Sequence, residues 1–200
     1  MKLSENKIFP TKLLPGDQVR VVSPARSMGI ISTAVRSIAM KRFGEMGLKV
    51  TFSKYCEELD SFDSSSIESR LEDIHEAFAD PQVKAILTTI GGCNSIQLLK
   101  GLNYELIKEN PKIFCGYSDI TTLQNAIFAK TGLVTYSGPH FSTFGCIKGI
   151  DYVIEYFQKC LFEREEQSIL SLASSSQWSD DEWYSDQENR SFFQTQVILY

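Results

Sequence analysis

A serine stands where an apolar run of this sequence meets a helical pattern. Residues 112–117 read Lys-Ile-Phe-Cys-Gly-Tyr and lead into Ser118, after which apolar residues recur at helical spacing at Ile120, Leu123 and Ile127. A strand that turns sharply into a helix lifts a serine hydroxyl out of the sheet. It also places that hydroxyl beside the free N–H groups of the helix start, which favour developing negative charge. The pattern therefore fits a serine nucleophile.

The same residues also fit a simpler interpretation, in which Ser118 only caps the helix. The full Gly-x-Ser-x-Gly signature of hydrolases is absent. The local sequence taken alone therefore favours the cap over the nucleophile.

A second chemically suggestive segment is the pair Gly91-Gly92, which follows an almost continuous apolar run over residues 83–90. Without β-carbons, the backbone can approach a ligand closely and direct N–H groups at it. Gly92 and Asp119 could donate these groups to the oxyanion of a tetrahedral intermediate. The alternatives are a phosphate cradle in a nucleotide-binding module and a tight turn that only glycine fits. Ser23-Pro24-Ala25 marks a third strand end of this kind.

A serine nucleophile needs a base, and the chain holds two histidines. His75 lies inside a predicted helix, which favours a partly buried or surface role. His140 follows a predicted strand and could reach the same rim as Ser118, although a loop histidine bonded to the backbone is the favoured interpretation. Cys93 and Cys115 also flank the predicted site, but a thiol inside an apolar strand such as Cys115 is usually inert.

Composition limits the class of protein. The chain has 200 residues, 42% of them hydrophobic, and a net charge of −5, which argues against a nucleic-acid surface. Five cysteines without paired spacing suggest neither a disulfide framework nor a zinc site, and they favour a reducing cytoplasm. No apolar stretch approaches the ~20 residues of a spanning helix, so no membrane role is expected.

Strand and helix patterns alternate along the chain. Strands are expected over residues 18–23, 48–52, 83–90, 113–117 and 133–136, and helices over 35–46, 67–78, 119–131 and 152–162, with a further helix around Ile96 and Leu99. This alternation predicts a doubly wound α/β fold with a mostly parallel sheet, of the flavodoxin-like or glutamine-amidotransferase-like type. Residues 1–165 are expected to form the α/β domain. Residues 166–200 are expected to form a linker, with Trp178 to Arg190 as a loop, and the start of a further domain.

Several segments together resemble the LD-carboxypeptidase family of serine peptidases, which includes the microcin C self-immunity peptidases. The matching segments are Leu14-Pro15-Gly16-Asp17, Ser23-Pro24-Ala25, Arg42-Phe43 to Gly47-Leu48-Lys49-Val50, Ile90-Gly91-Gly92 with Asn94-Ser95, Gly116-Tyr117-Ser118-Asp119-Ile120-Thr121 and Tyr136-Ser137-Gly138-Pro139. Their order and spacing extend over most of the chain. The resemblance shifts the interpretation of Ser118 from cap to nucleophile.

The resemblance implies a role for each matching residue. Ser118 would be the nucleophile, and the backbone N–H groups of Gly92 and Asp119 would form the oxyanion hole. The residues expected to contact substrate are Gly91, Asn94, Ser95, Trp178, Trp183 and Arg190. An aromatic ring among them could stack on a nucleobase, and Arg190 could meet a phosphate or carboxylate.

The implied reaction is hydrolysis of an amide next to a free carboxylate or similar group, with neither metal nor cofactor. The substrate would be a muropeptide that loses its terminal D-alanine, or a peptide–nucleotide of the microcin type. A family-like homodimer is a further option. The competing hypothesis is a flavodoxin-like module that binds a nucleotide or phosphate without chemistry.

One departure from the family pattern matters for catalysis. The family takes the Glu and His of its triad from a C-terminal domain, whereas this chain has no histidine after His140 and ends at Tyr200. The sequence therefore leads us to expect a nucleophile domain without its base, in an incomplete chain.

Overall fold

A parallel sheet of five strands forms the centre of the computed structural model, which describes residues 7–162, 171–182 and 187–196. The strands are β1 (Gln18–Val22), β2 (Lys49–Phe52), β3 (Val83–Thr88), β4 (Ile113–Gly116) and β5 (Tyr136–Ser137). They lie in the order β2-β1-β3-β4-β5, and each neighbouring pair is parallel. Because parallel neighbours need crossover connections, the chain runs through a helix or a long loop between them.

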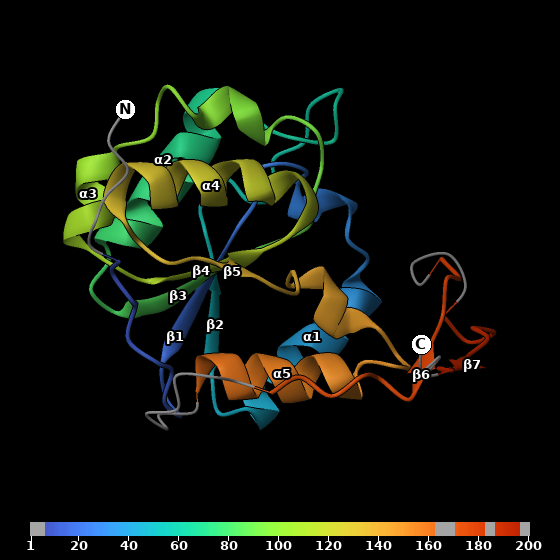
Figure 1. The fold of residues 1–200 in the computed structure, drawn as a ribbon. Coiled ribbons are helices and arrows are strands. Elements are labelled where there is room, and N and C mark those ends of the chain that lie inside the picture. The colour runs from blue at the N-terminus through green and yellow to red at the C-terminus, as the bar shows by residue number, and fades with distance from the viewer. Residues whose placement is uncertain (1–6, 163–170, 183–186, 197–200) are drawn as a thin grey trace.

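Helices cover both faces of the sheet (Figure 1). One face carries α2 (Ile67–Ala79), α3 (Tyr104–Glu109) and α4 (Thr121–Thr131), and the other carries α1 (Thr33–Glu45) and α5 (Asp151–Leu161). Successive strand residues point to opposite faces, so β4 places Phe114 in one hydrophobic cluster and Ile113 and Cys115 in the other. The predicted doubly wound α/β fold is confirmed.

Local signals in the sequence set several helix ends. The hydroxyls of Ser32 and Ser66 accept hydrogen bonds from backbone N–H groups in the first turns of α1 and α2. Gly47 and Gly132 follow α1 and α4 with φ of +76° and +81°, a conformation that glycine adopts without steric cost. These punctuation residues explain why the predicted helices match the observed ones within a few residues.

The prediction was wrong between β3 and β4. The helix expected around Ile96 and Leu99 is only a short 3-10 turn, η2 (Ser95–Leu98), and Ile96 is 61% exposed. A single apolar turn offers no continuous face to bury, so the turn does not extend. The chain instead begins α3 after Asn103, whose side chain accepts a hydrogen bond from Leu106 N (3.0 Å).

Strand β5 is shorter and later than predicted. Leu133, expected inside the strand, forms an isolated parallel bridge with Ile8 near the N-terminus. Only Tyr136 and Ser137 pair with β4. The N-terminal segment therefore takes over the pairing of the residues directly after α4.

The segment after α5 was predicted to be a loop over Trp178–Arg190. Gln177–Trp178 (β6) instead pairs antiparallel with Phe193–Gln194 (β7), beside one end of α5 (Figure 1). Lys148 Nζ donates to Glu188 O (2.7 Å), so this segment contacts the α/β unit. The domain boundary at residues 165 and 166 remains a prediction.

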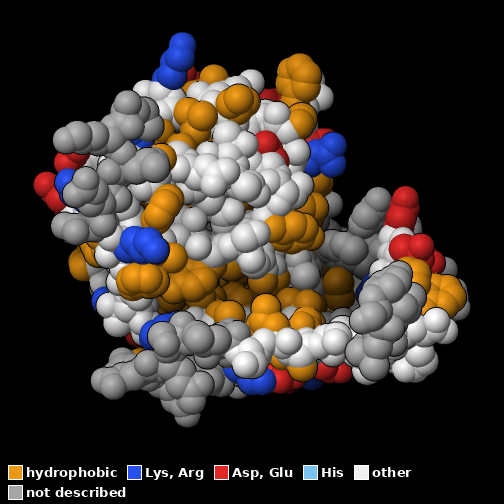
Figure 2. Space-filling model, in the orientation of Figure 1, with side chains coloured by type: hydrophobic (Ala, Val, Ile, Leu, Met, Phe, Trp, Pro, Cys, Tyr) orange, Lys and Arg blue, Asp and Glu red, His pale blue; other side chains and the backbone are white. Residues whose placement is uncertain are grey.

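An apolar hollow lies where β5 faces α5. Its volume is about 320 Å³, and its lining includes Tyr136, Pro139, Tyr152 and Phe157. Figure 2 shows hydrophobic side chains gathered on this side of the molecule. The hollow shares no lining residue with the cavity at Ser118 described next.

Candidate active site

A cavity of about 350 Å³ lies beyond the carboxyl ends of β1, β3 and β4. The order of the strands reverses between β1 and β3, and ligands of open α/β sheets bind at such switch points. Arg26 N donates to Gly91 O (3.3 Å), which joins the loop after β1 to the loop after β3. The cavity is lined by Arg26, Ile90, Gly91, Gly92, Cys93, Tyr117, Ser118, His140 and Ser142.

Ser118 occupies a strained corner between β4 and α4. Its φ is +61°, a conformation that is uncommon for residues other than glycine and that is often retained at functional sites. The cap positions of the 3-10 turn η3 (Ser118–Ile120) and of α4 are Tyr117 and Ile120, and neither makes a side-chain capping bond. Ser118 is exposed and lines the cavity. The interpretation of Ser118 as a helix cap is therefore wrong.

Gly91 and Gly92 leave room for two different neighbours. A β-carbon on Gly91 would lie 3.2 Å from Ser118 Oγ and 3.6 Å from His140 Nε2. A β-carbon on Gly92 would lie 2.9 Å from Ala25 Cβ, closer than real β-carbons approach. Gly91 thus keeps the space around the serine hydroxyl open, and Gly92 lets the loops after β1 and β3 pack together. Contacts within the protein therefore account for both glycines without a bound phosphate.

The residues that follow the two glycines brace the corner. Ser95 N donates to Asp119 Oδ2 (2.9 Å), and Ser95 Oγ donates to Asp119 O (2.8 Å). Asn94 Nδ2 donates to Ser64 Oγ (2.9 Å), and Asn94 lines a neighbouring cavity. Of the substrate contacts predicted in this loop, Gly91 reaches the cavity at Ser118, whereas Asn94 and Ser95 do not line it. The oxyanion donors Gly92 and Asp119 stay a prediction.

His140 lies beside Ser118, with 1% of its surface exposed. Its Nδ1 and Thr88 Oγ1 are 2.7 Å apart and share a hydrogen bond, a side-chain partner that the sequence did not indicate. The Tyr117 ring stacks on the imidazole at 4.2 Å between centroids. Burial lowers the pKa of His140 to about 4, and the Tyr117 carbonyl opposes this shift only in part. The imidazole is therefore neutral at physiological pH.

The other candidate nucleophiles and bases have no comparable setting. His75 Nε2 accepts a hydrogen bond from Asn103 N (2.9 Å), away from the cavity, in agreement with its predicted structural role. Burial raises the pKa of Cys115 to about 12, so its thiol stays protonated. Cys93 is exposed at the cavity edge.

The predicted contacts near the C-terminus are not brought to this cavity. Trp178 packs on Phe193 with 5.0 Å between ring centroids, and Arg190 Nη1 donates to Lys148 O (3.1 Å). Neither Trp178 nor Arg190 lines the cavity. Trp183 lies outside the described residues.

Sequence reasoning missed four residues of the site. Arg26 and Ser142 line the cavity, Tyr117 covers His140, and Thr88 holds it. Arg26 directly follows a strand end that the sequence had marked, so its neighbourhood was predictable. The contact between Thr88 and His140 joins positions 52 apart in the chain, and no local pattern indicates it.

Two further properties concern the described residues alone. They contain no group of three His, Cys, Asp or Glu side chains placed to hold a metal ion. None of the helices within them is long and apolar enough to cross a membrane.

Comparison with known proteins gives one family. The model of the LD-carboxypeptidase N-terminal domain matches residues 19–138. YocD of Bacillus subtilis (strain 168) is 55% identical over 186 residues, which are 93% of this chain and 56% of YocD. The crystal structure of an MccF-like protein from Bacillus anthracis str. Ames is 59% identical, with a TM-score of 0.89 over 94% of this chain and 56% of that one.

A more distant relative comes with a bound ligand. The microcin C7 self-immunity protein MccF of Escherichia coli is 31% identical over 183 residues, which are 90% of this chain and 52% of MccF. A structure of MccF in complex with aspartyl sulfamoyl adenosine has a TM-score of 0.86 and covers 94% of this chain and 57% of that one. The chain thus spans about half the length of the curated relatives that it matches.

Proposed function

Because this chain belongs to the LD-carboxypeptidase family, we propose that it carries the nucleophile of a serine-type hydrolase that cleaves an amide bond. The observation that carries the proposal is the conformation of Ser118. Ser118 is held at φ +61°, its side chain makes no capping hydrogen bond, and it lines a cavity. Helix capping therefore does not explain why the strained conformation is kept.

In this proposal Ser118 Oγ attacks the amide carbonyl, and the oxygen becomes negatively charged between the N–H groups of Gly92 and Asp119. Asp119 is well placed to keep its backbone fixed, since both its carboxylate and its carbonyl bind Ser95. Rigid donors need no rearrangement when the charge develops, and this lowers the barrier.

We do not assign the general base of the mechanism to a residue of these 200 positions. His140 is close to the serine, but with its pKa near 4 it is a weak base, and Thr88 holds its Nδ1. The family resemblance gives the base to a His and Glu of a C-terminal domain. The 200-residue chain by itself is therefore expected to turn over very slowly, using binding and the oxyanion hole alone.

We propose that the substrate is a small peptide conjugate with an anionic group near the scissile amide, either a muropeptide or a peptide–nucleotide. Support for the second class comes from MccF, which binds aspartyl sulfamoyl adenosine. Arg26 supports both classes, because its exposed side chain lines the cavity and can meet a carboxylate or a phosphate. The free cysteines support a cytoplasmic location.

The test is covalent labelling of Ser118 by a fluorophosphonate, followed by intact mass and peptide mapping. We expect a slow adduct at Ser118 that millimolar imidazole accelerates, because free imidazole is a stronger base than the buried His140. Ser118→Ala should abolish the adduct, and Ser137→Ala, at an exposed serine beside the site, should leave it unchanged. Labelling that is spread over exposed serines, or indifferent to Ser118→Ala, would refute the proposal.

A second measurement separates the substrate classes. Aspartyl sulfamoyl adenosine and a dipeptide ending in D-alanine are each added before labelling. Protection by the first alone favours a peptide–nucleotide substrate, and protection by the second alone favours a muropeptide.

A further inference from the structure

Two residues that line the cavity at Ser118 each have a buried polar atom without a hydrogen-bond partner. These atoms are His140 Nε2 and Ser142 Oγ, and each residue is only 1% exposed. Buried polar side chains in folded proteins nearly always have a partner, because an unpaired group loses its hydration without compensation. Two such atoms in one cavity therefore indicate a place that a ligand completes.

Both residues are held rigidly on the end of β3. Phe141 N donates to Thr88 O (2.8 Å), and Ser142 N donates to Thr89 O (3.1 Å). Thr88 Oγ1 also holds His140 Nδ1 at 2.7 Å. The backbone and one ring nitrogen are thus already engaged. Only Nε2 remains to meet a ligand, and its position is fixed in advance.

The position of these atoms relates them to the proposed reaction. A β-carbon on Gly91 would lie within 3.6 Å of both Ser118 Oγ and His140 Nε2, so both atoms border the space that Gly91 leaves open. The charged residue of the lining, Arg26, instead packs against Gly92 through its backbone and Cγ. The cavity therefore has a neutral polar side and a cationic side.

We propose that His140 Nε2 and Ser142 Oγ form a neutral hydrogen-bonding subsite that binds a peptide amide of the substrate next to the bond attacked by Ser118. The inference rests on the proposed function and adds a specificity-determining pair to it. An uncharged imidazole and a hydroxyl can donate and accept hydrogen bonds, as an amide does, and without a positive charge they attract a carboxylate less strongly than Arg26 does. In this arrangement the anionic group of the substrate binds on the side of the cavity that Arg26 lines.

Because the chain has two histidines, imidazole NMR tests this directly. The ¹⁵N and ¹³C resonances of both rings are followed while the 200-residue chain is titrated with a tripeptide ending in D-alanine, which has an amide next to the scissile one, and with the dipeptide, which lacks it. We expect the His140 Nε2 resonance to shift on saturation with the tripeptide and to move less with the dipeptide. His75, whose Nε2 already accepts from Asn103 N, is the internal control and should not move.

Variants then measure the contribution of Nε2. His140→Asn keeps an amide near Thr88 but removes Nε2, and it should weaken binding by roughly five- to tenfold. We expect a loss of the same size from Ser142→Ala. His140→Gln places an amide nearer the position of Nε2 and should recover part of that loss. His75→Gln should bind like the parent chain. Thermal unfolding of each variant checks that it is folded.

The outcomes are distinguishable. Saturable binding by calorimetry with an unmoved His140 resonance would overturn the subsite and leave the proposed function standing. Equal weakening by His140→Asn and His140→Gln would also overturn it, because a merely structural imidazole gives that pattern. If neither ligand binds and Ser118 is not labelled, the proposed function fails, and the subsite fails with it.

Discussion

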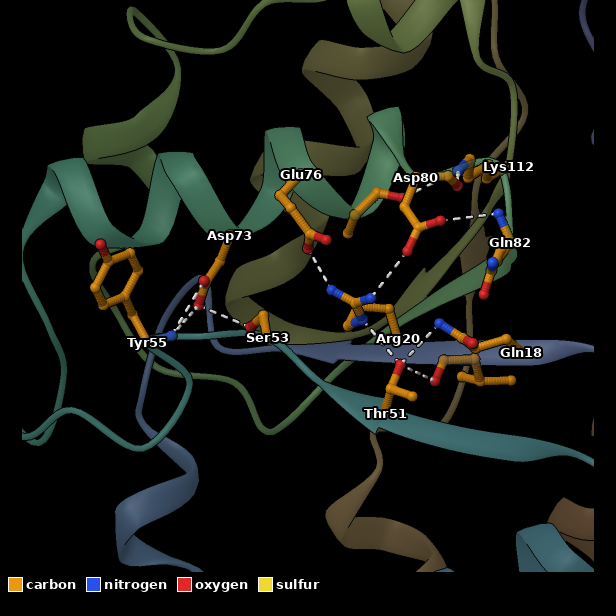
Figure 3. A network of polar contacts seen from close by, with 12 residues as sticks. Gln18, Arg20, Thr51, Ser53, Tyr55, Asp73, Glu76, Asp80, Gln82 and Lys112 are labelled. Carbon is orange, nitrogen blue, oxygen red and sulfur yellow. Dashed lines mark hydrogen bonds and ion pairs between the residues drawn. The ribbon is translucent and has the colours of Figure 1, made fainter.

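Two polar clusters sit on the same sheet and differ in how completely their groups are paired. One surrounds Arg20 on β1, under α2 (Figure 3). The other surrounds Ser118 and His140 at the carboxyl ends of the strands. Both contain buried or half-buried polar side chains, so burial of polarity alone does not mark a functional site.

The Arg20 cluster is built from mutually satisfied groups. Arg20 donates to Thr51 on β2 (2.8 Å to Oγ1), forms ion pairs with Glu76 of α2 and with Asp80, which follows α2, and has 11% of its side chain exposed. Lys112 donates to backbone carbonyls at the C-terminal end of α2, where a cation is favourable, and burial lowers its pKa to about 8. The cluster fastens α2 to the sheet, and none of its buried side-chain atoms lacks a hydrogen-bond partner.

The cavity cluster has the opposite character. Ser118 is held at positive φ, and His140 and Ser142 each keep a buried atom unpaired. Such features cost stability and persist only where the surrounding structure enforces them. Incomplete pairing and strain, rather than polarity, therefore separate a candidate site from a structural network. Four predictions test this contrast.

The largest expected effect is a loss of stability in acid that depends on His140. Its folded pKa of about 4 lies below the ordinary 6.5, so between these pH values the unfolded chain binds more protons. The free energy of unfolding therefore falls as the pH is lowered from 6.5 toward 4, by on the order of 3 kcal/mol, and the contribution is fully present above 6.5.

Urea denaturation at several pH values between 4.5 and 7 measures this effect. His140→Asn should flatten the acid limb. His75→Gln is the matched control: burial also lowers the pKa of His75, yet this variant should keep the larger part of the slope. Parallel curves for the parent chain and His140→Asn would show that the imidazole is not kept neutral by burial.

The next largest effect is expected from Gly91→Ala, whose added methyl group would partly fill the space beside Ser118. Gly91→Ala would place a β-carbon 3.1 Å from Ser118 Cβ and 3.2 Å from its Oγ, tighter than most real contacts. We expect fluorophosphonate labelling to fall about fiftyfold, since small misplacements of reacting groups cost that much. Gly44→Ala, where nothing lies within 4 Å of the new carbon, should label normally. Normal labelling of both variants would contradict the role of Gly91.

Particular residues show what the sequence could and could not predict. The corner at Ser118 and the pair Gly91-Gly92 were predictable, because a strand, a turn and a helix leave periodic and glycine signals within a few positions. The pairing of Ile8 with Leu133 and the short turn at Ile96 were not. At Leu133 a contact with a residue distant in sequence outweighed local propensity. At Ile96 no such contact buries the side chain, and the turn stays short.

The same limit applies to the site. Trp178 and Arg190 carry side chains that suit a nucleotide, yet they pack on Phe193 and Lys148 and line no part of the cavity. His140 and Thr88 meet across 52 positions, and only the sheet order brings them together. Residue type predicts what a side chain can do, and tertiary packing decides where it does it.

A third prediction concerns the paired cluster. Arg20→Met removes the partner of Glu76 and Asp80 and should lower the free energy of unfolding by about 2 kcal/mol, less than a fully buried pair because Glu76 is half exposed. Labelling of Ser118 should not change. The exposed pair Lys41–Glu45 is the control, and Lys41→Met should cost under ~0.5 kcal/mol. A loss of labelling in Arg20→Met would erase the distinction between the two clusters.

The smallest effect tests the strain at the nucleophile. Glycine adopts positive φ without the steric cost that a β-carbon imposes, although it also adds freedom to the unfolded chain. Ser118→Gly should therefore be more stable than Ser118→Ala by roughly 0.5–1 kcal/mol, while both lose labelling. Asp63, the other described non-glycine residue at positive φ (+56°), lies away from the Ser118 cavity, and Asp63→Gly against Asp63→Ala calibrates the same comparison. If Ser118→Gly proves the less stable of its pair while Asp63→Gly behaves as expected, the corner is not strained, and the mark that sets Ser118 apart from an ordinary surface serine is lost.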